Sequence, residues 1–200
     1  MRKIIRCKFK KHRKRKEVIR NIKCIYKRCE KYEKNNGQLS EIDTQILLIE
    51  PILCLAGYDI YNPYVVKRAS RSKQSQEFDI EVYKNGKLFL AIEVKRISSS
   101  EFNINKINKG IGKLSRSNNR WINNNGDGTG QLRAYCLNWN NKLNPCTIPI
   151  LTNGKEWVLF NLSSFTQNPQ QTINNNMILD KANITDSNFY NKIIQKIKNT

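Results

Sequence analysis

The sequence has few acidic residues, a single histidine and no long apolar segment. Only 16 of its 200 residues are Asp or Glu, against 36 Lys or Arg, so the formal net charge is +20. No apolar run approaches the roughly 18 residues that a membrane-spanning helix needs. The basic N-terminus also lacks the apolar stretch of a signal peptide. We therefore expect an intracellular, cytoplasmic protein that makes no membrane contact.

The histidine and cysteines are too scattered to form a zinc site. None of the six cysteines forms a Cys-x-x-Cys pair, and His12 is the only histidine. A zinc site needs clustered soft ligands at short spacing. In an intracellular protein we expect reduced thiols instead.

Positive charge is in excess and is concentrated near the N-terminus. Residues 1–34 hold 16 basic and three acidic residues, a net +13 of the total +20. Such a balance attracts polyanions, of which nucleic acid is the commonest. Apolar residues recur at helical spacing over 17–34, which predicts an amphipathic helix within a basic arm, residues 1–36. The alternatives are a solvated tail, a helix that packs on a partner, and a basic helix on an acidic membrane surface.

Apolar periodicity and turn residues predict an α/β fold. Ser40 and Asp43 form a capping-box pattern that starts a helix to about Leu55, with a kink at Pro51. The clearest strand pair covers 77–83 and 87–96. We further expect strands over 58–66, 147–152 and 156–162, helices over 130–137 and 187–198, and loop or coil over 67–76, 98–130 and 163–176.

The turn between the central strands, Lys84-Asn85-Gly86, allows two registers. A two-residue turn would pair Lys84 with Lys87 and place Asp79 and Glu93 on opposite faces. A turn closed by a glycine bulge would pair Tyr83 with Lys87. We favour the bulged turn, because it leaves one face wholly apolar and a one-residue slip would reverse every side chain. The apolar face would be Phe78, Ile80, Val82, Leu88, Leu90, Ile92 and Val94.

In the favoured register Asp79, Glu93 and Lys95 share one polar face. Two neighbouring carboxylates repel each other unless a cation lies between them, and Mg²⁺ prefers such oxygen ligands. Lys95 points the same way as Glu93 because strand side chains repeat with period two. It could orient or deprotonate a water and contact a phosphate. The alternative for an isolated Glu-x-Lys is a solvated ion pair.

Five stretches in this order resemble the PD-(D/E)xK nuclease superfamily, in particular the N-terminal nuclease domain of type I restriction enzyme HsdR subunits. The resemblance spans about residues 39–162. It rests on Ser40 to Thr44, on Leu48 to Leu53 followed by Ala56-Gly57-Tyr58-Asp59, on Phe78-Asp79 with Glu93-Val94-Lys95, on Gln131 to Tyr135, and on Leu151-Thr152-Asn153-Gly154 with Trp157 and Phe160.

The resemblance implies a restriction-endonuclease-like core, a central mixed β-sheet flanked by helices. That domain would cover residues 37–165, with a C-terminal coil and helix over 166–200. Asp79, Glu93 and the Val94 carbonyl would bind Mg²⁺, for which Mn²⁺ would substitute, and Lys95 would be catalytic. Gln131 and Tyr135 would help to place the DNA; otherwise they are a surface glutamine and a half-buried tyrosine.

A first-helix glutamate often joins the metal site in this superfamily, and Glu41 and Glu50 compete for that role. We favour Glu41, although it could simply stabilise the helix N-terminus, and Glu50 could be a solvated residue before a kink. The sequence departs from the family in having Phe78 where proline is usual and a long gap between Lys95 and Gln131. It contains no phosphate-binding Gly-x-x-x-x-Gly-Lys-Ser/Thr loop, so we expect a free-standing nuclease or one part of a split system.

Together these patterns predict a Mg²⁺-dependent DNA endonuclease that associates with the nucleoid. Double-strand cutting needs two active sites, which favours a homo-oligomer, and a partner subunit of a restriction system is the other expected association. The alternatives are a non-catalytic DNA-binding module and an RNA-directed nuclease. Trp121 could stack on a base, but we favour packing. The residues expected to contact nucleic acid are Arg13, Arg15, Lys67, Arg68, Arg71, Lys73, Arg116 and Arg120.

Overall fold

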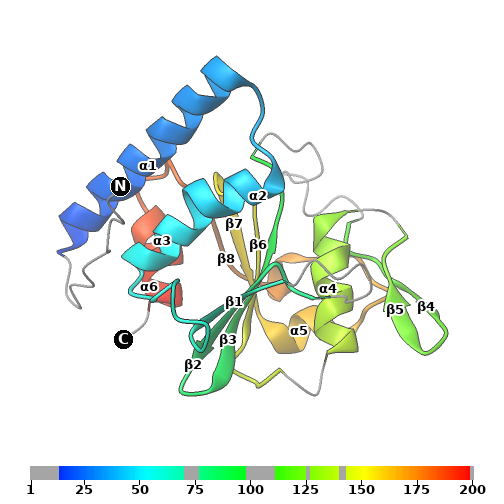
Figure 1. Cartoon of the computed structure of the whole chain (residues 1–200). Helices are drawn as coiled ribbons and strands as arrows, with labels where there is room; N and C mark the ends of the chain where they lie inside the picture. The colour runs from blue at the N-terminus through cyan, green and yellow to red at the C-terminus, as the bar shows by residue number, and fades with distance from the viewer. Residues whose placement is uncertain (1–13, 70–76, 98–110, 125–126, 140–142, 199–200) are drawn as a thin grey trace.

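A six-stranded mixed sheet forms the centre of the molecule, with helices on both faces (Figure 1). The computed structural model describes residues 14–69, 77–97, 111–124, 127–139 and 143–198. The strand order is β1-β2-β3-β6-β7-β8, and the α/β class is confirmed. The strands are β1 (Val66–Arg68), β2 (Ile80–Lys84), β3 (Lys87–Val94), β6 (Ile148–Thr152), β7 (Glu156–Phe160) and β8 (Ile178–Asn183).

The helices form one layer on each side of this sheet. One layer holds α1 (Arg15–Asn36), α2 (Glu41–Thr44), α3 (Glu50–Leu55) and α6 (Gln195–Ile197), with π-helical turns over Gln45–Ile49 and Tyr190–Ile194. The other holds α4 (Gly128–Asn138) and α5 (Leu162–Gln167). A short 3-10 turn, Asn175–Met177, precedes β8, and a separate two-stranded sheet pairs β4 (Ser115–Ser117) with β5 (Arg120–Ile122).

Each helical layer encloses its own apolar core. The first core lies under α1, α2, α3 and the C-terminal helices, and the second lies under α4 and α5. The buried face of α1 belongs to the first core, through Val18, Ile22, Tyr26 and Cys29. The helix expected over 17–34 is therefore confirmed, and it packs on the sheet domain instead of extending away from it. The C-terminal helix is also confirmed and lies in the same core.

The helix that follows α1 starts as expected but changes pitch midway. Ser40 and Asp43 form the capping box with reciprocal side-chain and backbone hydrogen bonds. One π-helical turn, Gln45–Ile49, then precedes Pro51. Because proline has no N–H to donate, a locally wider turn is one way for the helix to continue through it.

The central hairpin has the register predicted for its acidic residues, but the bulge that produces this register does not lie at the turn. Asn85 and Gly86 both have positive φ, 52° and 73°, so the turn is the two-residue form and Lys84 pairs with Lys87. The bulge lies inside β3 instead, because Val82 pairs with Leu90 while Tyr83 pairs with Leu88. The extra residue, Phe89, shifts the pairing of β2 with β3 by one residue. From Leu90 to Val94 the side chains therefore alternate between the two faces of the sheet as predicted.

The predicted turn type is therefore wrong, but the predicted grouping of the acidic residues holds. Beyond the bulge Ile80, Val82, Leu90, Ile92 and Val94 face the first core as expected. Leu88 and Phe78 were expected on that face and instead join the second core. The carbonyl of Leu88, next to the bulge, accepts hydrogen bonds from the Asn144 side chain and the Thr147 hydroxyl.

Several loop and strand predictions are wrong for local reasons. The segment 58–66 is mostly turn, because the side chains of Asp59 and Asn62 accept hydrogen bonds from the backbone two residues on. The predicted loops over 98–130 and 163–176 contain β4 and β5, and α5, respectively. Strand β8 was not predicted at all. None of the helices within the described ranges is long and apolar enough to cross a membrane.

Candidate active site

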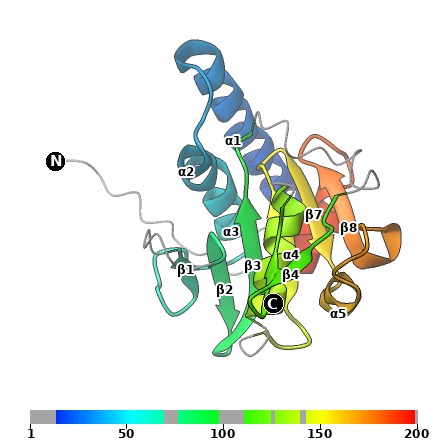
Figure 2. The same ribbon diagram turned by 90° about the vertical axis from the view of Figure 1, so that its right-hand side faces the viewer.

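The candidate site lies at the carboxyl end of β3, where the sheet has its one parallel strand pair among the described strands. β3 pairs with β6 in parallel, and the other four pairs are antiparallel. Helix α4 makes the crossover between β3 and β6 and packs beside them (Figure 2). In α/β sheets the carboxyl ends of parallel strands are the usual position for ligands.

Asp79 and Glu93 meet at this edge of the sheet. Continuing the register of Ile80 and Ile92 by one residue places Asp79 directly opposite Glu93. Asp79 Oδ2 accepts a hydrogen bond of 2.7 Å from the Val94 backbone N–H. The Glu93 side chain is only 2% exposed. Its Oε2 atom is buried and has no N–H or hydroxyl donor in the part of the chain that the structure describes, and the only further side-chain hydrogen bond of this carboxyl group would be one shared with Asp79, which lowers the pKa of Asp79.

Both carboxyl groups are held where negative charge is unfavourable. Burial, together with the nearby Asp79 carboxylate, raises the pKa of Glu93 to about 8. Burial also raises the pKa of Asp79, although the hydrogen bond from Val94 opposes that rise. A divalent cation between the two carboxylates would offset the cost of burying both negative charges and could bind the buried Oε2 atom of Glu93. The residues present therefore fit a hard metal ion.

Lys95 links the acidic pair to helix α4. Its Nζ donates to Glu93 Oε1 at 2.9 Å and to Gln131 Oε1 at 2.8 Å, and Gln131 Nε2 donates to the Tyr135 hydroxyl at 2.8 Å. Burial alone would lower the pKa of Lys95, but the charge of Glu93 and its hydrogen bond raise it overall. Lys95 is therefore an ammonium donor within a continuous chain of polar contacts.

Helix α4 approaches Lys95 closely because it begins at a glycine. A Cβ atom on Gly128 would lie 2.7 Å from Lys95 Cε, too close for any other residue without a shift. Asp127 caps the helix by accepting a hydrogen bond from the Gly130 N–H. These two residues were missed in the sequence, where they were assigned to a loop, although an aspartate followed by an apolar-periodic segment is a known signal for a helix start.

Glu41 and Glu50, the two glutamates considered for the metal site, lie in different surroundings. Glu41 lies at the start of α2, with its carboxylate 3.9 Å from Lys95 Nζ and its side chain 48% exposed. Glu50 is buried and bound by Arg68, whose Nε and Nη2 donate to its two oxygens at 2.7 and 2.9 Å. Gln45 donates to Glu50 as well. Glu41 is thus next to the acidic pair, and Glu50 has a structural role elsewhere.

Paired neutralisations are expected to distinguish these two glutamates. Glu50→Gln should lower the free energy of unfolding by about 2 kcal/mol, because it weakens two charge-assisted hydrogen bonds, and should leave Mg²⁺ binding unchanged. If Glu41 supports a metal site at the acidic pair, Glu41→Gln should leave the unfolding temperature nearly unchanged and weaken Mg²⁺ binding about tenfold, as loss of a neighbour of a metal site does. Thermal melts and calorimetric titrations with Mg²⁺ measure both effects, and the reversed pattern would assign Glu50 to the candidate site.

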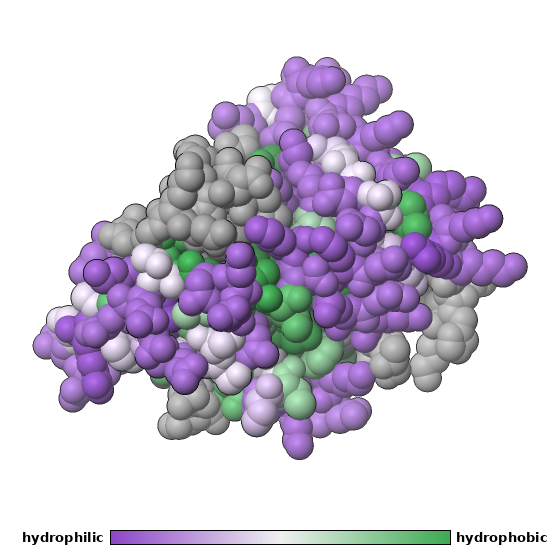
Figure 3. Space-filling model, turned by 180° about the vertical axis from the view of Figure 1, so that it is seen from behind, coloured by the Kyte–Doolittle hydropathy of each residue, from purple (hydrophilic) through white to green (hydrophobic). Residues whose placement is uncertain are grey.

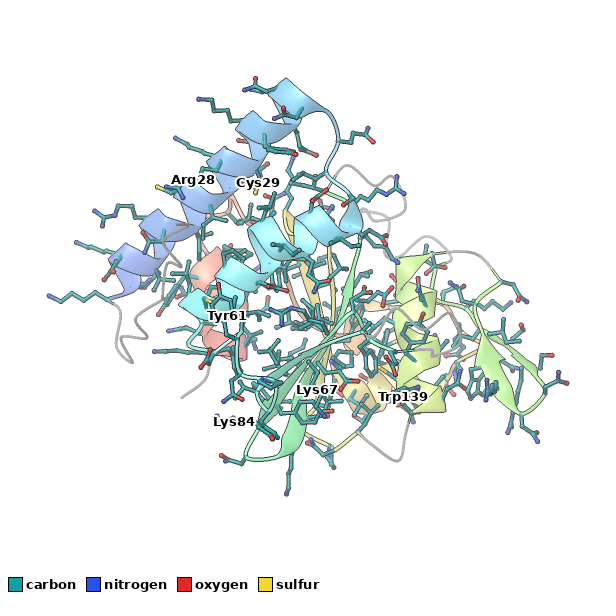
Figure 4. All side chains as sticks on the ribbon, viewed as in Figure 1. Arg28, Cys29, Tyr61, Lys67, Lys84 and Trp139 are labelled. Atoms are coloured by element: carbon teal, nitrogen blue, oxygen red, sulfur yellow. The ribbon has the colours of Figure 1, made fainter. Side chains whose placement is uncertain are left out.

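The residues expected to contact nucleic acid have different surroundings. Arg13, Arg71 and Lys73 lie outside the described residues. Arg68 is engaged by Glu50. Lys67 lies 4.6 Å from the centre of the Tyr83 ring, towards Lys84 at the hairpin turn and away from the carboxyl end of β3 (Figure 4). The other three are exposed: Arg15 over Tyr190, Arg116 over Trp121, and Arg120.

The acidic pair is the centre of the candidate site. Among the described residues, no group of three or more His, Cys, Asp or Glu side chains could hold a metal ion. No family model, curated protein or solved structure matches the chain. Function must therefore be inferred from Asp79, Glu93, Lys95 and their neighbours.

Proposed function

We propose that this chain is a Mg²⁺-dependent endonuclease that hydrolyses phosphodiester bonds in DNA, with a restriction-endonuclease-like core. The proposal rests above all on one observation, the buried Glu93 carboxyl group beside Asp79, whose Oε2 atom has no N–H or hydroxyl donor among the described residues. A buried carboxylate pair is costly for a stable fold and is typical of a site that holds a cation for chemistry. Asp79 and Glu93 would hold Mg²⁺, or Mn²⁺ in its place, with the Val94 carbonyl as a third ligand.

The bound metal would polarise the scissile phosphate and lower the pKa of a water. Lys95 supplies a positive charge next to Glu93 and has one ammonium hydrogen left after its contacts with Glu93 and Gln131. That hydrogen can be donated to a phosphate oxygen or to the attacking water. The raised pKa of Lys95 favours this donor role over proton abstraction.

Gln131 and Tyr135 hold this lysine in place and extend the polar chain along α4. Gln131 accepts from Lys95 and donates to the Tyr135 hydroxyl, so its amide has a defined orientation. Because the Tyr135 oxygen accepts that hydrogen bond, its own proton is available for an outer acceptor such as a DNA phosphate. The ring of Tyr135 packs edge-on against Phe78, with centroids 6.0 Å apart.

The outer face of α1 provides a surface suited to the DNA backbone. Its exposed basic residues recur every three or four positions and so form one ridge, and Figure 3 shows a largely hydrophilic surface there. Contacts of this kind release counterions and carry no sequence information. The ridge consists of Lys16, Arg20, Lys23, Lys27, Lys31 and Lys34.

Cleavage of supercoiled plasmid tests the proposed function. With Mg²⁺ or Mn²⁺ the purified protein should convert the plasmid to nicked or linear forms, and excess EDTA should abolish conversion. Linear product at early times would support the expected oligomer or a partner subunit, since double-strand cutting needs two active sites. A well-folded preparation that binds plasmid but never cuts it, across metals and substrates, would instead indicate a non-catalytic DNA-binding module.

A further inference from the structure

The segment between β3 and α4 contains a small ribbon apart from the main sheet. β4 and β5 form an antiparallel pair in which Ser115 faces Ile122, Arg116 faces Trp121 and Ser117 faces Arg120. Their connection is Asn118-Asn119, both with positive φ, 47° and 59°. This is the tight two-residue turn whose twist matches that of the strands. In Figure 1 the ribbon stands out beside α4, away from the six-stranded sheet.

The ribbon is clamped to the helix that carries Gln131 and Tyr135. The Asn138 side chain accepts from the Trp121 N–H at 2.9 Å and donates to the Trp121 carbonyl at 3.0 Å. The Asn138 amide thus forms the pair of hydrogen bonds that a neighbouring strand would form with the outer edge of β5. At the base, Asn123 donates to the carbonyl of Asp127, the N-cap of α4. The ribbon is therefore held against α4, the helix that contributes Gln131 and Tyr135 to the candidate site.

The two faces of the ribbon differ in character. Side chains alternate along each strand, so Arg116 and Trp121 share one face, where the guanidinium lies 5.7 Å from the ring centre. Ser115, Ser117, Arg120 and Ile122 share the other face, which therefore has two short polar side chains, one long cation and one exposed apolar side chain. No acidic residue occurs between residues 111 and 124, where Lys113, Arg116 and Arg120 are all exposed.

We propose that this ribbon enters the major groove of double-stranded DNA and reads base edges through Arg120, Ser117 and the Asn118-Asn119 turn. The inference rests on the proposed DNA substrate but assigns a recognition role that the catalytic site does not supply. Arg116, stacked on Trp121, faces away from the bases and contacts the DNA backbone.

The dimensions and chemistry of the ribbon suit this role. The major groove of B-form DNA is wide enough for a two-stranded ribbon and displays a distinct donor and acceptor pattern for each base pair. Arginine binds guanine there with two hydrogen bonds, and asparagine does the same with adenine. The short serine side chains let the strand approach the base edges. No acidic residue within the ribbon neutralises its positive charge.

Selection of binding sites from a random duplex library in EDTA, where no cleavage occurs, tests the inference. The wild-type chain should enrich a defined motif. Arg120→Ala should lower the preference for that motif over random duplex by about 10- to 100-fold, the usual cost of losing one two-bonded arginine contact. Because the readout is binding alone, a failure of cleavage leaves this test unaffected.

Arg116→Ala is the matched control, since it removes the same charge from the other face of the same ribbon. It should weaken binding to all duplexes evenly and keep the motif. The proposal is overturned if the wild-type chain enriches no motif, if Arg120→Ala keeps the full preference, or if Arg116→Ala loses the preference as completely as Arg120→Ala does.

Discussion

Replacing Lys95 with alanine is expected to slow DNA hydrolysis by about a thousandfold, within the range for loss of a positioned proton donor or base. The substitution removes the ammonium that donates to Glu93 and Gln131, and with it the one cation that lies between the acidic pair and α4 in the described structure. Single-turnover cleavage with excess protein measures the chemical step separately from DNA binding.

Lys87→Ala is the matched control for this variant. Lys87 is an exposed lysine at the other end of the same strand, so its loss removes equal charge far from the site. Both variants should bind DNA in EDTA with similar affinity, and only Lys95→Ala should lose cleavage. Wild-type cleavage by folded Lys95→Ala would contradict the proposed role of this lysine.

Replacing Arg133 with leucine is expected to lower the free energy of unfolding by about 4 kcal/mol. The Arg133 guanidinium is fully buried, and burial lowers its pKa to about 10. It forms no ion pair with a carboxylate in the described part of the chain and donates instead to the backbone carbonyls of Phe165, Gly112, Pro169, Gln171 and Asn168. Leucine would leave several buried carbonyls without donors, at about 1–3 kcal/mol each before local relaxation.

Urea denaturation measures this loss of stability. Arg133→Lys should recover only part of it, because an ammonium has three hydrogens and cannot match the fork of the guanidinium. Arg28→Leu, an exposed arginine on α1, should change stability by no more than about 0.5 kcal/mol. An unchanged urea midpoint for Arg133→Leu would show that these carbonyls find other donors.

The parts of the fold that could be predicted from sequence are those decided by local patterning. Apolar periodicity located α1, α4, β6, β7 and the central hairpin, and burial of one face of that hairpin correctly grouped Asp79 with Glu93. The prediction was wrong about the position of the bulge that brings these two residues to the same face. The Phe89 bulge has no turn residue to mark it, and it depends on how Leu88 packs against the second core.

Other features could not be predicted because they depend on contacts between distant parts of the chain. Arg133 looks like a surface residue of a helix, but the carbonyl groups that its guanidinium binds lie 21 to 38 residues away. The choice between Glu41 and Glu50 likewise depended on Arg68, which lies 18 residues beyond Glu50 and was expected to contact DNA. The ribbon at β4 and β5 was hidden because its strands have three residues each and almost no apolar alternation.

Calorimetric titration of Mg²⁺ into the protein, at pH 6 and pH 8, tests most directly whether Asp79 and Glu93 share a cation. Because the pKa of Glu93 is about 8 without metal, its carboxyl is mostly protonated at pH 6, and a cation must displace that proton. We expect one site that binds about 10- to 100-fold more tightly at pH 8 than at pH 6, releases a proton at pH 6, and is lost in Asp79→Asn. Absence of binding, or equal binding by Asp79→Asn, would contradict the account.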